Sequence, residues 1–233
     1  MKINLLAIGA HPDDIELGCG GTLLKHKKEG FTTGIIDLTK GELGTRGSAE
    51  IRTKEAKLAA KLLNVDIRNN LMLTDGFFEN NKKNQLKLIK LIRKHKPDII
   101  LTNAYSDRHP DHGRAARLVN DACFLSGLVK VKDGQNPWRP KNIYNYIQFN
   151  LTTPNLLVDI SKHIDIKMNA ILAYKSQFYD PKSKELETVI SKKSFIEGVR
   201  HRSANFGRII GVDYAEAFTV NKPIGSKNLI NLI

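Results

Sequence analysis

The chain has 233 residues, of which 41% are hydrophobic and 26% are charged. These proportions are those of an ordinary globular protein and exclude a disordered or fibrous chain. No apolar run approaches the ~20 residues that span a bilayer. The apolar opening is interrupted by His11 and Pro12, too early for a secretory signal. The sequence therefore predicts a cytoplasmic protein with no membrane partner.

The net charge is +13, from 37 basic and 24 acidic residues. Such an excess is typical of proteins that bind nucleic acids, anionic membranes or acidic small molecules. The lysines, however, are dispersed in pairs and short clusters, without an RNA-binding motif or zinc-finger spacing. We therefore expect a solvated basic surface and no nucleic-acid partner. The two cysteines, Cys19 and Cys123, fit a reducing compartment and give no disulfide framework.

Apolar periodicity predicts alternating strands and helices over the first part of the chain. The expected strands are 2–9, 31–38, 67–73 and 98–103. The expected helices are 15–29, 49–63, 85–95 and 113–128. Alternation at roughly 30-residue intervals indicates an α/β protein with parallel strands and right-handed crossovers. We predict a Rossmann-like, doubly wound, mostly parallel sheet flanked by helices, with the strand order 3-2-1-4-5.

The second half of the chain is less regular. After a loop, the expected elements are strands at 143–149 and 156–160, helices at 161–178 and 192–206, and a last strand at 214–220. No repeat or long linker interrupts the chain, so we predict one domain over 1–233. Its core is expected at about 1–130 and a more specialised part at about 131–233. The tail from Asn228 fits an oligomer contact and a frayed end equally well.

Two polar segments follow the first and fourth predicted strands. They are His11–Asp14, with the sequence His-Pro-Asp-Asp, and Asp107–His112, with the sequence Asp-Arg-His-Pro-Asp-His. In a doubly wound sheet these strands are neighbours, and ligands bind outside their carboxyl ends, where the strand order reverses. The fold therefore predicts that the two segments converge, although they are far apart in the sequence.

The residue types in these segments point to hydrolytic metal chemistry. Two histidines and a carboxylate, with a fourth position open for water, form a common catalytic zinc shell. Zinc lowers the pKa of water and polarises a carbonyl, while a second carboxylate and a further histidine can move protons. The segments supply all these parts with His11, Asp13, Asp14, His109, Asp111 and His112. The spacing leaves open which carboxylate binds the metal.

Structural explanations compete with this interpretation. Asp13, Asp14 or Asp111 could cap the helices that follow. The glycines of Gly18–Gly21 suggest a dinucleotide fingerprint, but they fall inside a helix instead of in the turn that precedes it. Close packing on the sheet explains these glycines better. A non-catalytic sugar- or nucleotide-binding module of the same fold remains the alternative from another functional class.

The segments 10–14 (Ala-His-Pro-Asp-Asp) and 109–112 (His-Pro-Asp-His) resemble the paired motifs of the PIG-L/LmbE-like zinc N-deacetylases. That family removes acetyl groups from N-acetylglucosaminyl conjugates. The further segments 41–47, 173–178 and 211–218 are similar to its bacillithiol-biosynthesis branch, which deacetylates N-acetylglucosaminyl malate. The resemblance implies hydrolysis of that substrate to glucosaminyl malate and acetate by a homo-oligomer, with a hexamer as the form it suggests. Deacetylation of another N-acetylglucosamine conjugate is the alternative.

The resemblance also implies roles for the polar residues. His11, Asp14 and His112 would bind one zinc ion per chain, at a site that other divalent metals also fit. Asp13 would be the general base. His109, oriented by Asp111, would stabilise the oxyanion or protonate the departing amine.

The same resemblance implies contacts with the substrate. Arg52 would hold the substrate, and Asp75 is a candidate for a sugar hydroxyl. A malate group carries two carboxylates, for which Arg108 and Arg46 are further candidate partners. Some family members use a tyrosine near the reacting carbonyl, but Asp107 and Phe195 stand where it would be sought, so no tyrosine is assigned.

Overall fold

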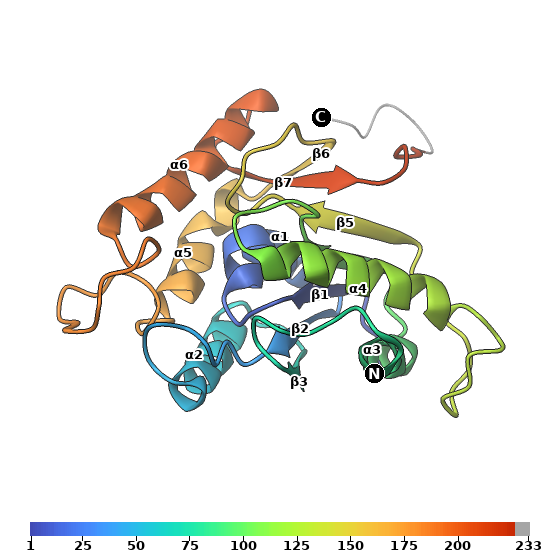
Figure 1. Ribbon diagram of the computed structural model, residues 1–233. Helices are drawn as coiled ribbons and strands as arrows, with labels where there is room; N and C mark the ends of the chain where they lie inside the picture. The colour runs from blue at the N-terminus through green and yellow to red at the C-terminus, as the bar shows by residue number, and fades with distance from the viewer. Residues whose placement is uncertain (227–233) are drawn as a thin grey trace.

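The computed structural model describes residues 1–226. They fold around one sheet of seven strands (Figure 1). The strands are β1 (Leu5–Gly9), β2 (Thr33–Thr39), β3 (Ile67–Leu73), β4 (Ile99–Asn103), β5 (Asn142–Tyr146), β6 (Leu156–Asp159) and β7 (Ala215–Val220). Their order is β3-β2-β1-β4-β5-β7-β6. The first five strands are parallel, which confirms the predicted order 3-2-1-4-5.

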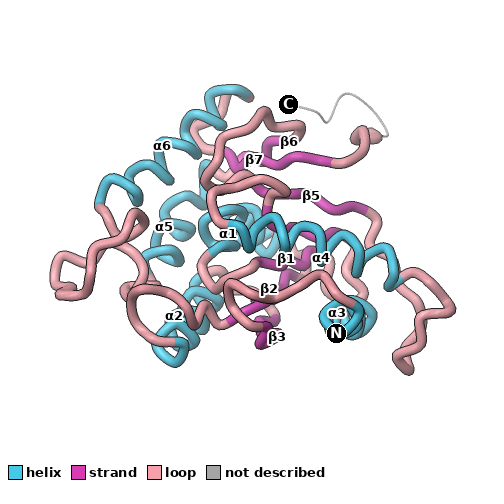
Figure 2. The backbone as a smooth tube through the Cα atoms, viewed as in Figure 1, coloured by secondary structure: helices cyan, strands magenta, loops and turns pink. Residues whose placement is uncertain are grey.

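Helices cover both faces of this sheet, as Figures 1 and 2 show. The helices are α1 (Asp14–Lys28), α2 (Ala49–Leu62), α3 (Lys82–His95), α4 (Pro110–Ser126), α5 (Ile164–Leu172) and α6 (Lys193–Ile209). Apolar side chains of α3 and α4 pack on one face of the sheet. Those of α1, α2, α5 and α6 join the core on the other face. The predicted fold class, a mostly parallel α/β sheet flanked by helices, is confirmed.

In the C-terminal part, the structure decides one point that the sequence left open and corrects another. The last strand, β7, inserts between β5 and β6 and runs antiparallel to both. The helix expected at 161–178 is shorter, because a 3₁₀ turn occupies Ser161–His163 and α5 ends at Leu172. The residues after α5 are held instead by side chains of other helices: the hydroxyl of Tyr174 donates to Glu16. Such long-range hydrogen bonds are not visible in a local apolar pattern.

Helix α1 is broken at Cys19, whose φ of −147° and ψ of 19° are not helical. A Cβ atom at Gly18 would lie 2.2 Å from the ring of Tyr146, and one at Gly21 would lie 2.8 Å from Ile160. These glycines therefore let the helix approach its neighbours closely, as expected, and they do not form a phosphate-binding turn. The carboxylate of Glu216 accepts hydrogen bonds from the backbone of the second half of the helix.

Within the described residues, no helix combines the length and the apolar character that a membrane crossing needs. Cys19 and Cys123 are both buried and free, in agreement with the absence of a predicted disulfide framework. The tail from Asn228, for which an oligomer contact was considered, lies outside the described residues.

Candidate metal centre and active site

The two polar segments converge at the carboxyl ends of β1 and β4. These strands pair in parallel, so their ends lie at the same edge of the sheet. Asn103, the last residue of β4, connects the two segments. Its Oδ1 accepts from the backbone N–H of Ala10 at 3.0 Å, and its Nδ2 donates to Asp14 Oδ2 at 3.2 Å. The convergence predicted from strand order is therefore present.

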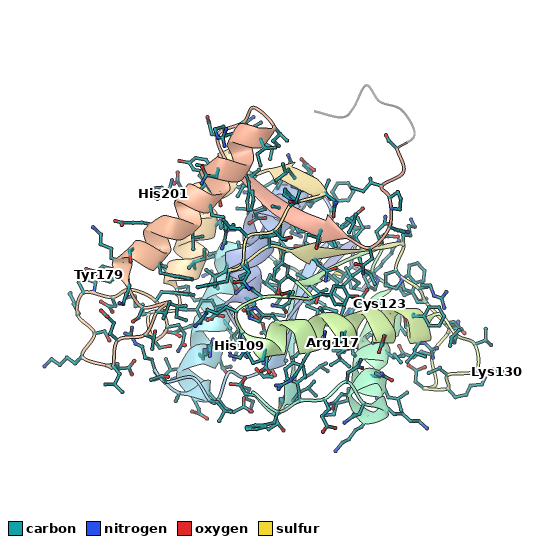
Figure 3. All side chains as sticks on the ribbon, turned by 45° about the horizontal axis from the view of Figure 1, so that its top comes forward. His109, Arg117, Cys123, Lys130, Tyr179 and His201 are labelled. Carbon is teal, nitrogen blue, oxygen red and sulfur yellow. The ribbon has the colours of Figure 1, made fainter. Side chains whose placement is uncertain are left out.

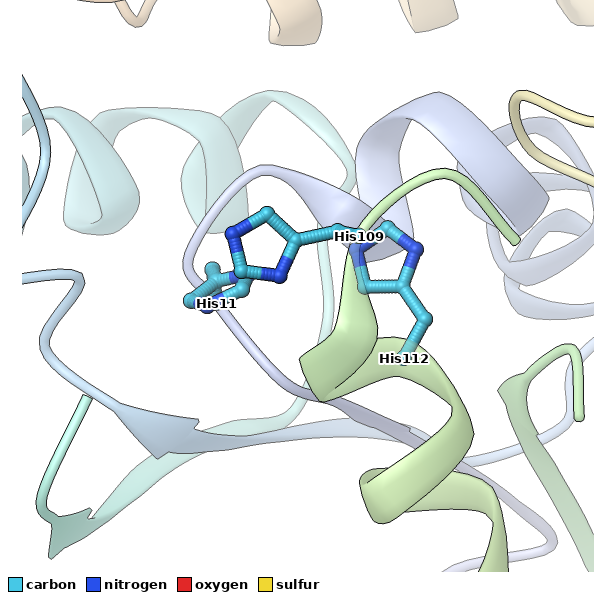
Figure 4. Close-up of side chains that lie close together, drawn as sticks. All are labelled: His11, His109 and His112. Atoms are coloured by element: carbon cyan, nitrogen blue, oxygen red, sulfur yellow. The ribbon is translucent and has the colours of Figure 1, made fainter. Parts of the chain in front are cut away.

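Three histidines meet at this edge (Figure 4). The ring centroids of His11 and His109 are 4.6 Å apart, and those of His109 and His112 are 5.5 Å apart. One ring nitrogen from each histidine lies within 4.8 Å of the corresponding nitrogens of the other two. His11 comes from the loop after β1, whereas His109 and His112 belong to the start of α4, where Figure 3 labels His109.

The carboxylate of Asp14 lies between two of these rings. Its Oδ2 is 3.5 Å from His11 Nδ1, and its Oδ1 is 3.1 Å from His112 Nε2. Gln148 Nε2 also donates to Oδ1 at 2.8 Å. Burial alone would raise the pKa of Asp14, but the field of His112 and hydrogen bonds from both histidines hold this pKa well below its usual range. Asp14 is therefore an ionised carboxylate between two imidazole nitrogens, where its oxygens could help to hold a cation.

Other carboxylates engage the opposite nitrogen of each ring. Asp107 Oδ2 lies 2.8 Å from His112 Nδ1. Asp75 Oδ1 lies 2.9 Å from His11 Nε2, and Asp111 Oδ2 lies 3.2 Å from the same atom. A carboxylate on the far nitrogen is the usual partner of a metal-binding histidine, because it fixes the ring and its tautomer.

Spacing alone groups the nitrogens of His11, His109 and His112, and separately His11 with Asp75 and Asp111. The Asp14 carboxylate adds a third combination, because it lies within 3.5 Å of His11 Nδ1 and within 3.1 Å of His112 Nε2. Two imidazole nitrogens and one carboxylate suit a divalent metal such as zinc. Although burial lowers the pKa of His112, Asp14 and Asp107 raise it to about 9. The same negative field that favours a proton on this ring favours a cation between the ligands. The residues present therefore fit a divalent metal.

Asp13 lies next to these donors but points to a different partner. Its Oδ2 accepts from Arg52 Nη2 at 2.7 Å, and both side chains are buried. Burial raises the pKa of Asp13 to about 6, although Arg52 acts in the opposite direction. The φ of Asp13 is 110°, a left-handed conformation that is strained for a non-glycine residue. Its side chain makes no capping hydrogen bond, so the capping explanation is wrong for this residue.

His109 is the residue that caps α4. Its Nδ1 accepts from the backbone N–H of Asp111 at 3.2 Å, so the neutral ring carries its proton on Nε2. Burial, together with His11 and His112, lowers the pKa of His109, which favours this neutral form. Asp111 therefore contacts His109 through its backbone N–H and not through its carboxylate. Its carboxylate contacts His11 instead and is also held by Arg114 at 2.6 Å.

A cavity of about 450 Å³ opens over these groups, within the range of small-molecule sites. Of the ten residues predicted for the site, all but Asp111 line it. Asp111 is fully buried behind His11. At one end the loop before α6 lies beside the loop before α2 (Figure 2), and Arg46 there donates to Ser183 at 2.6 Å. Asp75, considered for a sugar hydroxyl, is engaged with His11 Nε2.

Sequence reasoning missed three polar residues at the site, Asn103, Gln148 and Arg202. Asn103 ends β4, and Gln148 follows β5, the neighbouring strand. A polar side chain at the end of an apolar strand beside the switch point was the signal that could have identified both. Arg202 lies on α6, far along the chain, and no local pattern distinguishes it from other helix arginines.

The partner of His112 gives a first testable expectation. Asp107→Asn keeps the shape of the side chain but removes the charge beside His112 Nδ1. Loss of such a partner typically weakens metal binding about 10- to 100-fold, because the ring is less well fixed and less basic. Titration of zinc against a competing chelator measures the change. Asp165→Asn, an exposed aspartate beside Arg200, serves as the control, and an unchanged zinc affinity in Asp107→Asn would contradict the assignment.

Comparison with known proteins places these motifs in a family. Residues 6–123 match the PIG-L family, described as GlcNAc-PI de-N-acetylase, and this stretch contains both polar segments. The chain therefore belongs to the PIG-L family. This membership confirms the resemblance seen in the sequence.

Individual relatives are similar over most of their length. The diacetylchitobiose deacetylase of Thermococcus kodakarensis is 28% identical, over 84% of this chain and 82% of that protein. A probable N-acetyl-alpha-D-glucosaminyl L-malate deacetylase 2 of Bacillus subtilis is also 28% identical, over 76% of this chain and 84% of that protein. The crystal structure of a conserved protein from Thermus thermophilus superposes with a TM-score of 0.88 at 38% identity, and the match covers 96% of this chain and 97% of that one.

Proposed function

We propose that the protein is a zinc-dependent N-deacetylase that hydrolyses the acetamide of an N-acetylglucosaminyl conjugate. One observation carries this proposal: a fitting set of metal ligands, His11, Asp14 and His112, lies beside a second, ionisable carboxylate, Asp13, in the same cavity. A binding module has no need of that second carboxylate. When bound, the metal supplies a Lewis acid for the acetyl carbonyl and makes water more acidic.

Residues of the chain then move the protons and stabilise the charge that develops. Asp13 takes a proton from the attacking water, and the Arg52 guanidinium holds its carboxylate in place. The water oxygen adds to the acetyl carbon, and the negative charge that develops on the carbonyl oxygen is stabilised by the Nε2–H of His109. When the carbon–nitrogen bond breaks, the proton that Asp13 took from the water passes to the amine nitrogen, and the products are acetate and a free amino sugar.

The proposed substrate is N-acetylglucosaminyl malate, which would give glucosaminyl malate in bacillithiol biosynthesis. Support comes from the branch-like segments at 41–47, 173–178 and 211–218 and from a relative described as a probable deacetylase of that compound. The second candidate is an N-acetylglucosamine disaccharide, favoured by the similarity to a diacetylchitobiose deacetylase. The two candidates differ in charge, since only the malate conjugate is anionic.

A substrate panel tests this proposal. The zinc-loaded protein is incubated with N-acetylglucosaminyl malate, diacetylchitobiose and free N-acetylglucosamine, and the release of acetate and free amine is quantified. We expect kcat/KM for the malate conjugate to exceed that for free N-acetylglucosamine at least about tenfold, since each charge-assisted contact contributes ~1.5–3 kcal/mol. A preference for diacetylchitobiose would replace the malate assignment. Stoichiometric zinc without acetate release from any compound would favour the non-catalytic module.

The predicted single domain, cytoplasmic location and homo-oligomer belong to the same proposal. Each is an expectation from the sequence and from the resemblance to the family. Light scattering of the purified protein measures the oligomer directly, and a monomer at micromolar concentration would remove that part of the proposal.

A further inference from the structure

Four arginines line the cavity, and they differ in their partners. Arg52 is paired with Asp13, and Arg46 is held by Ser183 and by Glu185, whose Oε2 lies 3.3 Å from its Nε. Arg108 and Arg202 form no ion pair with any residue in the part of the chain that the structure describes. Two guanidinium groups without a carboxylate therefore face one small-molecule cavity.

Arg202 is the more buried of these two guanidinium groups. It is half-buried on α6, and one of its nitrogens, Nη2, donates to the backbone carbonyl of Leu17 at 2.9 Å. A guanidinium has five N–H donors, so most of them remain for a ligand. Burial lowers the pKa of Arg202 to about 10, with Glu216 and Asp107 acting in the opposite direction, so the group is charged at neutral pH.

Arg108 lies at one end of a row of stacked aromatic rings that leads to the same side of the cavity. Its guanidinium lies 4.8 Å from the ring centre of Phe149. The ring of Phe149 stacks on that of Phe195 at 6.2 Å, and Phe195 belongs to α6, one face of which also carries Arg202. Phe149 and Phe195 both line the cavity. The α6 side of the cavity is thus an apolar wall with two unpaired cations.

We propose that Arg202 binds the anionic group of the substrate's aglycone and thereby selects charged N-acetylglucosaminyl conjugates. This inference rests on the proposed deacetylase function. The reacting acetamide must lie at the metal ligands, and the aglycone is attached to the neighbouring carbon of the sugar. It therefore has to occupy an adjoining part of the cavity. The α6 side offers guanidinium donors without internal partners, which suit a carboxylate or a phosphate.

The test compares three substrates that share N-acetylglucosamine and differ in charge. They are the malate conjugate, N-acetylglucosamine 1-phosphate and the neutral methyl glycoside. Arg202→Gln removes the charge but can still donate to the Leu17 carbonyl. Arg202→Lys restores a charge without the planar guanidinium. Arg200→Gln is the matched control, because Arg200 is on the same helix but pairs with Asp165.

We expect Arg202→Gln to reduce kcat/KM for an anionic conjugate about 10- to 100-fold, mainly through KM, the range for one charge-assisted hydrogen bond. The methyl glycoside should change by less than about twofold, because it carries no anion for the residue to bind. Arg202→Lys should recover part of the loss, and the Arg200 variant should behave as wild type. A loss confined to the malate conjugate or to the 1-phosphate identifies which anion Arg202 binds.

Two results would overturn the inference. An equal loss of kcat/KM on all three substrates would mean that Arg202 acts on the site only through Leu17 and α1. No loss of kcat/KM on any substrate would mean that Arg202 does not contact the substrate. If the wild-type protein deacetylates none of them, the proposed function fails by itself. Calorimetric titration of malate into the zinc-loaded wild type and Arg202→Gln then decides the inference, because weaker binding by the variant supports it and equal binding overturns it.

Discussion

Replacing His112 with alanine is expected to empty the metal site and to abolish deacetylation. His112 Nε2 lies 3.1 Å from Asp14, the carboxylate that also contacts His11, so in the proposed ligand set it supplies one of three donors. Loss of a partner behind a ligand typically costs 10- to 100-fold in metal affinity, and loss of the ligand itself should cost more than about 100-fold. His11→Ala should have the same effect, because the ligand set is equally incomplete.

Elemental analysis after gel filtration measures this effect. About one divalent ion per chain is expected for the wild type and close to none for either variant. His201→Ala is the matched control, since His201 is an exposed histidine on α6 (Figure 3) and should leave both metal and activity unchanged. Thermal unfolding of the metal-free proteins shows whether the variants still fold. Full occupancy in both His11→Ala and His112→Ala would contradict the ligand assignment.

Asp13→Asn is expected to keep the metal and to lose about 10²- to 10⁴-fold in kcat, the usual contribution of a general base. Asparagine preserves the shape of the side chain and can still accept a hydrogen bond from Arg52, but it cannot take a proton from water. Asp13 contacts neither His11 nor His112 through a hydrogen bond or ion pair in the described part of the chain, so the ligand set should remain intact.

Asp14→Asn provides the contrast. It removes the charge between the two imidazole rings and should release the metal together with the activity. Measuring zinc content and kcat for both variants separates the two roles, with Asp121→Asn, an exposed change on α4, as the control. If Asp13→Asn emptied the site while Asp14→Asn retained the metal, the roles of base and ligand would have to be exchanged.

Much of the fold was determined by the sequence alone. Alternating apolar segments predicted the strands and helices of the first half and the order 3-2-1-4-5 of the five parallel strands, the fifth of which lies in the second half. The position of His11 and His112 after adjacent strands then predicted their convergence. This worked because strand and helix periodicity are local properties, and because the right-handed crossover rule converts their succession into a sheet order.

Only the tertiary structure decided which partner each of these side chains contacts. It placed Asp14 between the two imidazoles, Asp13 on Arg52, and the carboxylate of Asp111 on His11 instead of on His109. It also brought Arg202 to the cavity from α6, where this side chain donates to the carbonyl of Leu17, 185 positions away in the sequence. No local pattern encodes such contacts, because each depends on the loop conformations and packing that the whole fold imposes.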